Sequence, residues 1–293
     1  MFETHSVPAT FIAPSGMVSA FCNGRPTSLV IDIGARETRV VPVVDGYTLK
    51  NAVVVTKRGG NWIDKNIFSH LESSNNIPLK LWFDKSNQAF NPTSSFRTMH
   101  TMDIIQDIKK WMCFVPKDTL TPELLDSLKM PPYELPDGTQ ISPCMEICSL
   151  PGHLFSSDRE HLKILSNFNA SLPAHLQPID IEHDESSLQE LIQIAISKCD
   201  VDVRKELLSN ISLCGGGAGF DGLIPRLTHE LSSILPSNYK IKVLPLLPIE
   251  RRFSAWIGGS ILAICGTFQQ LWISSKEYEE YGSNILLKSK CIY

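Results

Sequence analysis

Hydrophobic residues gather in short continuous runs in the first sixty positions of the chain. The run at 28–34 predicts a buried strand that ends in a carboxylate and a glycine. A second strand is predicted over 38–44 and a third over 47–55, with Asp45-Gly46 as the turn between them. The beginning of the chain therefore predicts an antiparallel meander.

Helical spacing dominates the middle of the chain. A short helix is predicted near 63–71, and a longer one over 104–115, where the apolar positions form a single stripe. The stripe consists of Ile104, Ile105, Ile108, Trp111, Met112 and Val115. Asp-Gly lies at the turn of a hairpin predicted over 133–141. The segments 73–95 and 156–187 are polar and rich in turn residues, so we expect loops or an irregular connection there.

Further along the chain, the sequence predicts both helices and strands. A helix is expected over 187–197, and a short strand over 210–214 leads into the glycine run 215–219. Apolar residues between 223 and 235 then predict another helix, and alternation over 239–244 predicts another strand. The segment 254–272 is apolar and contains Gly258-Gly259, where we expect two elements to pass closely.

Composition narrows the class of protein. The 293 residues are 43% hydrophobic and 20% charged, which is typical of a globular chain long enough for more than one lobe. The net charge of -4 disfavours a globally basic nucleic-acid binder, so we expect any association with DNA to come through partner proteins, without sequence-specific contacts of its own. The first residues lack the pattern of a signal peptide, and no apolar stretch has the length of a membrane span.

The eight cysteines are scattered along the chain, and we expect reduced, mostly buried thiols. Cys144 and Cys148 form the close pair. Neither a matching second pair nor a histidine cluster in the sequence completes a zinc site around them. The sequence therefore predicts no metal site.

The segment from strand 210–214 through the glycines to the next helix has the arrangement of a nucleotide-binding turn. Glycines let the backbone approach a ligand, and a helix start offers N–H groups to negative charge. The same residues also make ordinary tight turns. Asp32, at the end of its strand, is suited to a divalent ion near phosphates or, alternatively, to capping the turn with Gly34.

Three basic residues have similar alternatives. Lys109, on the polar side of its helix, either packs beside a nucleotide base or stays solvated. Arg251 and Arg252 either stack on a planar ligand or pair with Glu250 and its neighbours.

Taken together and in order, these pieces resemble the actin family. The carrying motifs are ERRFSAWIGGSILA at 250–263, GTFQQLWIS at 266–274, EYEE at 277–280 and KC at 290–291, with MFET at 1–4, PA at 8–9, DGY at 45–47, YELPDG at 133–138 and CDVDVRK at 199–205 upstream. Within the family, the C-terminal motifs and AFCNGRPT at 20–27 are most similar to the nuclear type-four actin-related proteins. The resemblance spans nearly the whole chain.

The resemblance implies an α/β, actin-like (ribonuclease-H-like) fold that lacks its N-terminal part and carries an inserted α+β subdomain. MFET matches a segment well inside the family's chain, so we expect the native gene to encode an upstream segment. The expected divisions are 1–23 as a remnant of the outer lobe, 24–58 and 186–253 as the inner-lobe core, 59–158 as the inserted subdomain, 159–185 as an irregular connection and 254–293 as C-terminal actin elements.

Actins bind ATP with a divalent cation between two phosphate loops. The resemblance places a degenerate form of the second loop at 32–38 and the adenosine contacts further along. The implied positions are Asp32, Gly34, Thr38, Lys109, Gly215, Gly216, Gly217 and Arg252. Ala35, Arg36 and Glu37 depart from the family pattern, Glu37 would repel a phosphate, and Lys110 replaces an acidic ribose ligand. ATP would bind at most weakly.

The water-positioning glutamine and histidine of actins align with Ser15 and Arg39, which cannot orient or deprotonate water in the same way. No catalytic residues are therefore expected. The resemblance implies a structural subunit of nuclear chromatin-remodelling or histone acetyltransferase complexes. It would dock beside 254–272 on a helical segment of the scaffold or ATPase subunit, next to an actin monomer. The alternative is an ATP-binding, cytoskeletal actin-like protein of the cytoplasm.

Overall fold

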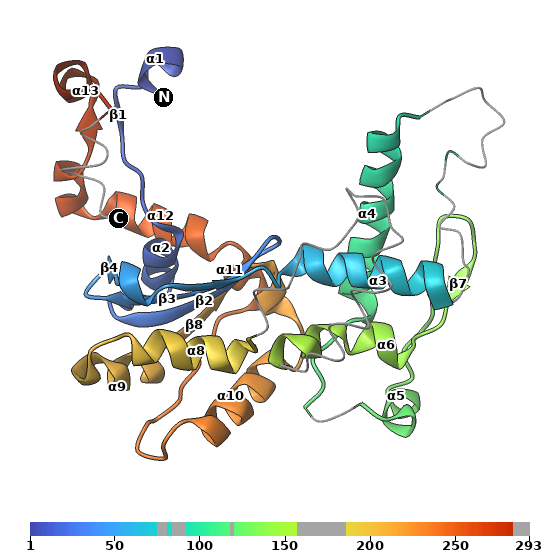
Figure 1. Ribbon diagram of the computed structural model, residues 1–293. Coiled ribbons are helices and arrows are strands. Elements are labelled where there is room, and N and C mark those ends of the chain that lie inside the picture. The colour runs from blue at the N-terminus through green and yellow to red at the C-terminus, as the bar shows by residue number, and fades with distance from the viewer. Residues whose placement is uncertain (75–80, 82, 84–91, 118–119, 157–185, 284–293) are drawn as a thin grey trace.

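The computed structural model describes residues 1–74, 81, 83, 92–117, 120–156 and 186–283 (Figure 1). Among these residues a mixed five-stranded sheet has the order β4–β3–β2–β8, with β5 also paired to β3. β2 runs antiparallel to β3 and parallel to β8. The strands are β2 (Ser28–Ile33), β3 (Thr38–Val44), β4 (Tyr47–Thr48), β5 (Val54–Thr56) and β8 (Ile211–Cys214).

The first two predicted strands are confirmed, and so is their Asp45-Gly46 turn, in which both residues have positive φ. The single third strand predicted over 47–55 is wrong. The chain forms β4, a 3₁₀ turn η1 (Lys50–Ala52) and then β5. β4 pairs with Val43 and Val44 of β3, whereas β5 pairs with residues 38–40 of the same strand. Pro42 lies between these stretches, and because it has no N–H to donate, the ladder breaks beside it.

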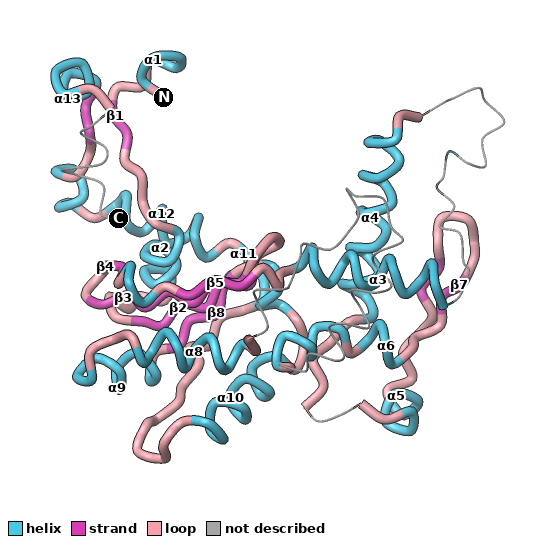
Figure 2. Tube along the Cα trace, in the orientation of Figure 1, coloured by secondary structure: helices cyan, strands magenta, loops and turns pink. Residues whose placement is uncertain are grey.

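Helices cover both faces of the sheet (Figures 1 and 2). Side chains of β2 alternate between two cores: Leu29 and Ile31 belong to the larger cluster with α8 and α10, and Val30 to a smaller one with α2. This burial on both faces explains the unbroken apolar run of β2. The covering helices are α2 (Ser15–Cys22) and α12 (Ser254–Ile264) on one face and α8 (Leu188–Ser197), α9 (Val201–Ser209) and α10 (Leu223–Ile234) on the other.

The helices predicted over 187–197 and 223–235 are confirmed as α8 and α10, but the strand predicted over 239–244 is wrong. That segment touches the sheet at one isolated bridge, where Val243 lies beside Ile211. Tyr239, Ile241 and Val243 still pack against the core, which accounts for the alternation of apolar and polar residues in this segment. The chain then leaves the sheet for α11 (Pro248–Arg252).

A second region with its own core lies between β5 and α8, at the right of Figure 1. The helix predicted over 104–115 begins ten residues earlier, because Thr93 caps it by accepting from the backbone N–H of Phe96, 3.4 Å away. Of its predicted stripe, Trp111 is exposed rather than buried, and Val115 lies beyond the end of the helix at Met112. The region comprises α3 (Gly60–Ser74), α4 (Ser94–Met112), α5 (Pro122–Ser127), β6 (Tyr133–Glu134), β7 (Gln140–Ile141), α6 (Met145–Cys148) and η3 (Leu150–Phe155).

The hairpin predicted over 133–141 is confirmed as β6–β7, with Gly138 at a φ of 85°. The helix expected near 63–71 is longer than predicted at both ends. Most of the loops expected over 73–95 and 156–187 lie outside the described residues.

The two ends of the described chain form one unit, seen at the upper left of Figure 1. Its strands β1 (Ala9–Thr10) and β9 (Ile273–Ser274) pair antiparallel, and the rings of Phe2 and Tyr278 stack with centroids 4.7 Å apart. The remaining elements of the unit are α1 (Phe2–His5), η5 (Gly266–Gln270) and α13 (Ser275–Tyr281). The first ten residues therefore pack on the C-terminal elements.

The close approach expected at Gly258-Gly259 occurs at only one of the two glycines. A Cβ on Gly258 would lie 1.6 Å from the carbonyl oxygen of Val18 on α2, whereas one on Gly259 would meet nothing within 4 Å. Consecutive helical residues point about 100° apart, so only one of them can face α2. The expectation for Gly259 is wrong.

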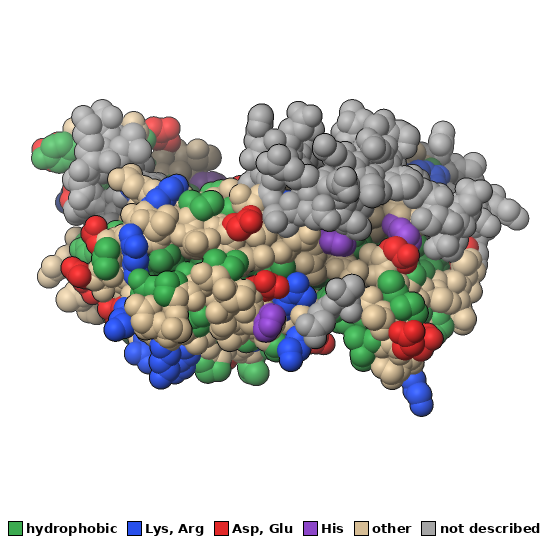
Figure 3. All heavy atoms as spheres, turned by 60° about the horizontal axis from the view of Figure 1, so that its bottom comes forward, with side chains coloured by type: hydrophobic (Ala, Val, Ile, Leu, Met, Phe, Trp, Pro, Cys, Tyr) green, Lys and Arg blue, Asp and Glu red, His purple; other side chains and the backbone are tan. Residues whose placement is uncertain are grey.

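The surface of the described part gives two further observations. Figure 3, which turns the underside of Figure 1 toward the reader, shows acidic and basic side chains mixed among polar and apolar ones. None of the helices in the described ranges combines the length and the apolar character needed to cross a membrane.

Candidate functional site

The predicted nucleotide site is centred where the ends of β2 and β8 meet. Asp32 is opposite Arg39 on β3 and beside Cys214 on β8. Gly215 follows β8 with a φ of 88°, and a Cβ there would lie 2.6 Å from Asp32 Oδ1 and 2.4 Å from the carbonyl oxygen of Ile33. Only glycine satisfies both the backbone angle and this contact. The fold therefore brings the carboxylate and the glycine loop together.

The other glycines of the site differ in their surroundings. A Cβ on Gly217 would lie 2.4 Å from Ile33 Cγ2, so Gly217 is needed for packing. Gly216 has open space around it, which leaves its backbone accessible to a ligand. Gly34 closes the hairpin by donating its N–H to the carbonyl of Glu37 at 3.0 Å. With Gly215, four predicted glycines thus border the same corner of the sheet as Asp32.

Asp32 is half-buried, and burial is the main cause that raises the pKa of its carboxyl group. Arg39 acts in the opposite direction and Glu37 in the same direction as burial. Arg39 also forms an exposed ion pair with Glu37, which offsets part of the negative charge of the hairpin. A carboxylate in this position could hold a cation or its water shell, although one carboxylate alone makes a weak site.

Two predicted ligands are engaged elsewhere. Thr38 is buried, and its hydroxyl donates to the backbone carbonyl of Arg58 at 2.7 Å. Lys109 Nζ is 2.7 Å from Asp64 Oδ1 and 3.2 Å from the carbonyl oxygen of Gly60, and both charged side chains are largely buried. Lys109 is therefore largely removed from solvent, and its ammonium group is paired within the protein. It joins α4 to α3 at the edge of the hairpin.

The two arginines before Phe253 have different roles. Arg252 is exposed, and its guanidinium lies 5.5 Å from the centroid of the Phe253 ring. Arg251 is buried, donates to the carbonyl of Ala218 at 2.8 Å, and accepts through its own carbonyl from the N–H of Gly215 at 2.9 Å. Burial lowers the pKa of Arg251. Arg251 therefore holds the glycine loop, a role that the sequence did not predict, and the adenosine contact expected of Arg252 stays a prediction.

Ser15 and Arg39 are the residues that the resemblance to actins aligns with the water-positioning glutamine and histidine. Ser15 is the exposed first residue of α2, and its hydroxyl cannot act as a general base. Arg39 is a cation paired with Glu37. The described residues of the site thus offer a carboxylate and a glycine loop, and neither Ser15 nor Arg39 is suited to deprotonate water.

A second feature is an apolar face on α11 and α12. Ile249, Glu250, Phe253, Trp256 and Ile257 line an open hollow with a volume of about 420 Å³. Trp256 is 76% exposed, Ile249 59% and Phe253 47%. Glu250 is occupied in capping α11, since its carboxylate accepts from the N–H of Leu247 at 2.8 Å. The lining is otherwise apolar, and we call this surface the Trp256 face.

The central sheet, the glycine loop beside Asp32 and the helical region between β5 and α8 form a mixed α/β architecture of the actin type. The actin family model matches residues 1–292, and the chain belongs to the actin family. Relatives to which the chain is similar are proteins named Actin-related protein 4.

Three of these relatives come from plants and a yeast. The chain is 35% identical to the protein of Oryza sativa subsp. indica over 307 residues, which cover 99% of this chain and 66% of the rice protein. The values are 33% over 304 residues for Arabidopsis thaliana, covering 99% and 67%, and 31% over 320 residues for Schizosaccharomyces pombe, covering 99% and 72%. The chain therefore spans about two thirds of the length of these relatives.

Proposed function

We propose that this chain is a non-catalytic structural subunit of nuclear chromatin-remodelling or histone acetyltransferase complexes. The Trp256 face would dock on an amphipathic helix of the scaffold or ATPase subunit, with an actin monomer as a neighbour. The observation that carries the proposal is the exposure of three large apolar side chains around one hollow. Contiguous exposed apolar surface of this kind is typical of interaction sites.

A helix is the occupant that the shape of the Trp256 face favours. Ile249, Phe253, Trp256 and Ile257 come from two consecutive helices and the residue between them, and together they line the one hollow. A partner helix with apolar residues three and four apart can lay its own stripe along such a surface. Tryptophan is also the residue type that most often supplies binding energy in interfaces.

A non-catalytic role is supported by the state of the nucleotide site. Thr38 and Lys109 are committed to internal contacts, and Ser15 and Arg39 stand where water would have to be activated. Binding of ATP without turnover is compatible with this proposal. Filament formation in the cytoplasm is the alternative that it opposes.

The proposal is tested by purifying the tagged native gene product from nuclei and quantifying the subunits that co-purify. Trp256→Glu should reduce recovery of the scaffold at least about tenfold, because truncating a central interface tryptophan costs about 2 kcal/mol or more. Trp111→Glu is the matched control, since Trp111 is also exposed but lies on α4. Circular dichroism must show that both variants are folded. Recovery of the protein in cytoplasmic filaments, or equal scaffold recovery with Trp256→Glu, would contradict the proposal.

A further inference from the structure

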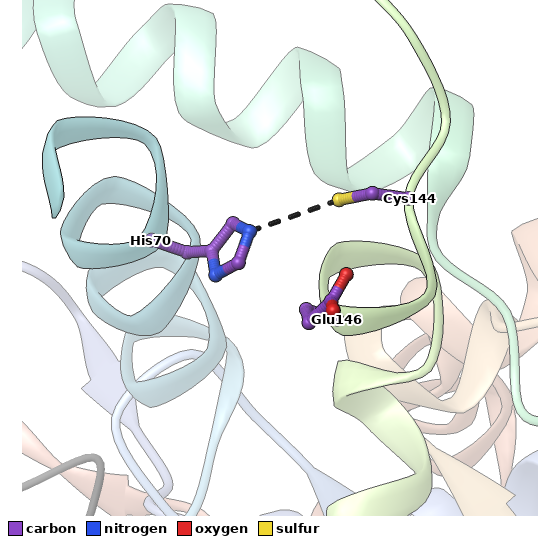
Figure 4. A group of neighbouring side chains, drawn as sticks. All are labelled: His70, Cys144 and Glu146. Atoms are coloured by element: carbon purple, nitrogen blue, oxygen red, sulfur yellow. Dashed lines mark hydrogen bonds between the residues drawn. The ribbon is translucent and has the colours of Figure 1, made fainter. Parts of the chain in front are cut away.

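Three side chains with metal-binding atoms meet where α3 passes the start of α6 (Figure 4). His70 lies on α3, Cys144 is the N-cap of α6, and Glu146 belongs to its first turn. His70 Nε2 is 3.8 Å from Cys144 Sγ, and one donor atom from each of the three residues lies within 4.8 Å of the others. In Figure 4 the imidazole and the thiol point toward each other, and the carboxylate borders the same space.

The spacing of the first two ligands fits zinc. With a Zn–S bond of about 2.3 Å and a Zn–N bond of about 2.0–2.1 Å, tetrahedral geometry puts sulfur and nitrogen about 3.6 Å apart. The observed 3.8 Å is close to this value. Glu146 is exposed, so a change of its side-chain rotamer can bring the carboxylate to a bound ion without disturbing the core. The half-buried His70 and Cys144 are positioned by the helix packing around them.

We propose that His70, Cys144 and Glu146 bind one zinc ion. Imidazole and thiolate together favour zinc over magnesium or calcium, which prefer sets of oxygen ligands. Three protein ligands leave the fourth position to water or to a group of a partner protein. The sequence prediction of no metal site counted ligands close to Cys144 and Cys148 along the chain. His70 is 74 residues from Cys144, and folding brings the two together.

Zinc binding forms Zn–N, Zn–S and Zn–O bonds and releases the thiol proton of Cys144 to solvent. The ion then joins α3 to α6 and closes the intervening chain into a loop. Because an ion bound only by the folded state stabilises that state, zinc should raise the melting temperature of the protein. This effect is independent of nucleotide or partner binding.

The test uses the full chain, stripped of metal with a chelator and titrated with zinc, with cobalt(II) as a spectroscopic substitute. The wild type should bind one equivalent, melt at a higher temperature with zinc, and show a thiolate-to-cobalt charge-transfer band with tetrahedral d–d bands. Cys144→Ser should lose the charge-transfer band. Cys144→Ser and His70→Ala should weaken zinc binding more than about 100-fold, since even outer-shell partners of zinc ligands are worth about 10–100-fold.

Glu146→Gln changes a surface residue, so it keeps the test valid if the other two variants fail to fold. It should weaken zinc binding at least about tenfold. Cys265→Ser and His229→Ala alter an exposed cysteine and an exposed histidine elsewhere, and both should behave as wild type. Absence of the cobalt band from the wild type would overturn the proposal. So would undiminished zinc binding by Glu146→Gln, or loss of the band in Cys265→Ser while Cys144→Ser keeps it.

Discussion

Gly258→Ala should strongly destabilise the contact between α2 and α12. The new Cβ would start 1.6 Å from the carbonyl oxygen of Val18, and ordinary contact begins at 3.4 Å, so the helices must separate by about 1.8 Å. The obstacle is backbone, which cannot rotate away as a side chain would. The separation would also break the buried hydrogen bond between the hydroxyls of Ser19 and Ser254, now 3.2 Å apart.

The size of the effect follows from three contributions. Overpacking against backbone costs about 3 kcal/mol, the upper end of the usual range, and the lost hydrogen bond costs about 1 kcal/mol. Alanine returns about 1 kcal/mol through its better helix propensity. The expected net loss is about 3 kcal/mol, or a fall in melting temperature of roughly 6–12 °C.

The assay is thermal unfolding of the wild type, Gly258→Ala and Gly259→Ala, followed by circular dichroism. Gly259→Ala is the matched control, because it makes the same substitution one residue along the same helix and meets open space. It should leave stability unchanged or raise it by about 1 kcal/mol. If Gly258→Ala melts at or above the wild-type temperature, or if both variants are equally destabilised, the argument for a one-sided helix contact is refuted.

Three further predictions concern the charged groups of the nucleotide site. Asp64→Ala should destabilise the protein by about 3–5 kcal/mol in denaturant unfolding, because it leaves the buried ammonium of Lys109 uncompensated, and a wild-type midpoint would refute this. Asp32→Asn should raise the melting temperature at neutral pH. It should not do so at pH 3, where the protonated Asp32 of the wild type and the asparagine of the variant are both uncharged. The reason is that burial raises the pKa of Asp32, so its ionised form costs stability above that pKa, and an equal shift at both pH values would contradict it. Purified protein should release phosphate from ATP no faster than Asp32→Ala does, given Ser15 and Arg39 at the water-positioning places; turnover that Asp32→Ala abolishes would show the reverse.

Local sequence signals were sufficient for three strands of the sheet, β2, β3 and β8. β2 and β8 are predictable because strands buried on both faces carry unbroken apolar runs. The break between β4 and β5 had a signal too, since Pro42 cannot complete the ladder of β3. The segment 239–244 alternates like a strand because it packs apolar residues against the core, so its period alone cannot reveal that it lacks a partner strand.

The candidate sites depend on contacts between distant positions, which sequence patterns do not record. Lys109 forms an ion pair with Asp64, 45 positions earlier, only because α3 and α4 pack together. Arg251 and Arg252 are chemically equal in the sequence, and the direction in which α11 presents them decides which one holds the glycine loop. The proximity of His70 to Cys144 is of the same kind.

The central claim is that the Trp256 face docks on a scaffold helix. The most direct measurement places a photo-crosslinking amino acid at position 256 of the native gene product in cells, followed by nuclear isolation and identification of the crosslinked peptide. The account predicts a peptide from a chromatin-complex subunit, with apolar residues at intervals of three and four. The same crosslinker at Trp111 should not yield that peptide. Crosslinks from position 256 solely to other parts of the same polypeptide would show that the face is internal and would contradict the account.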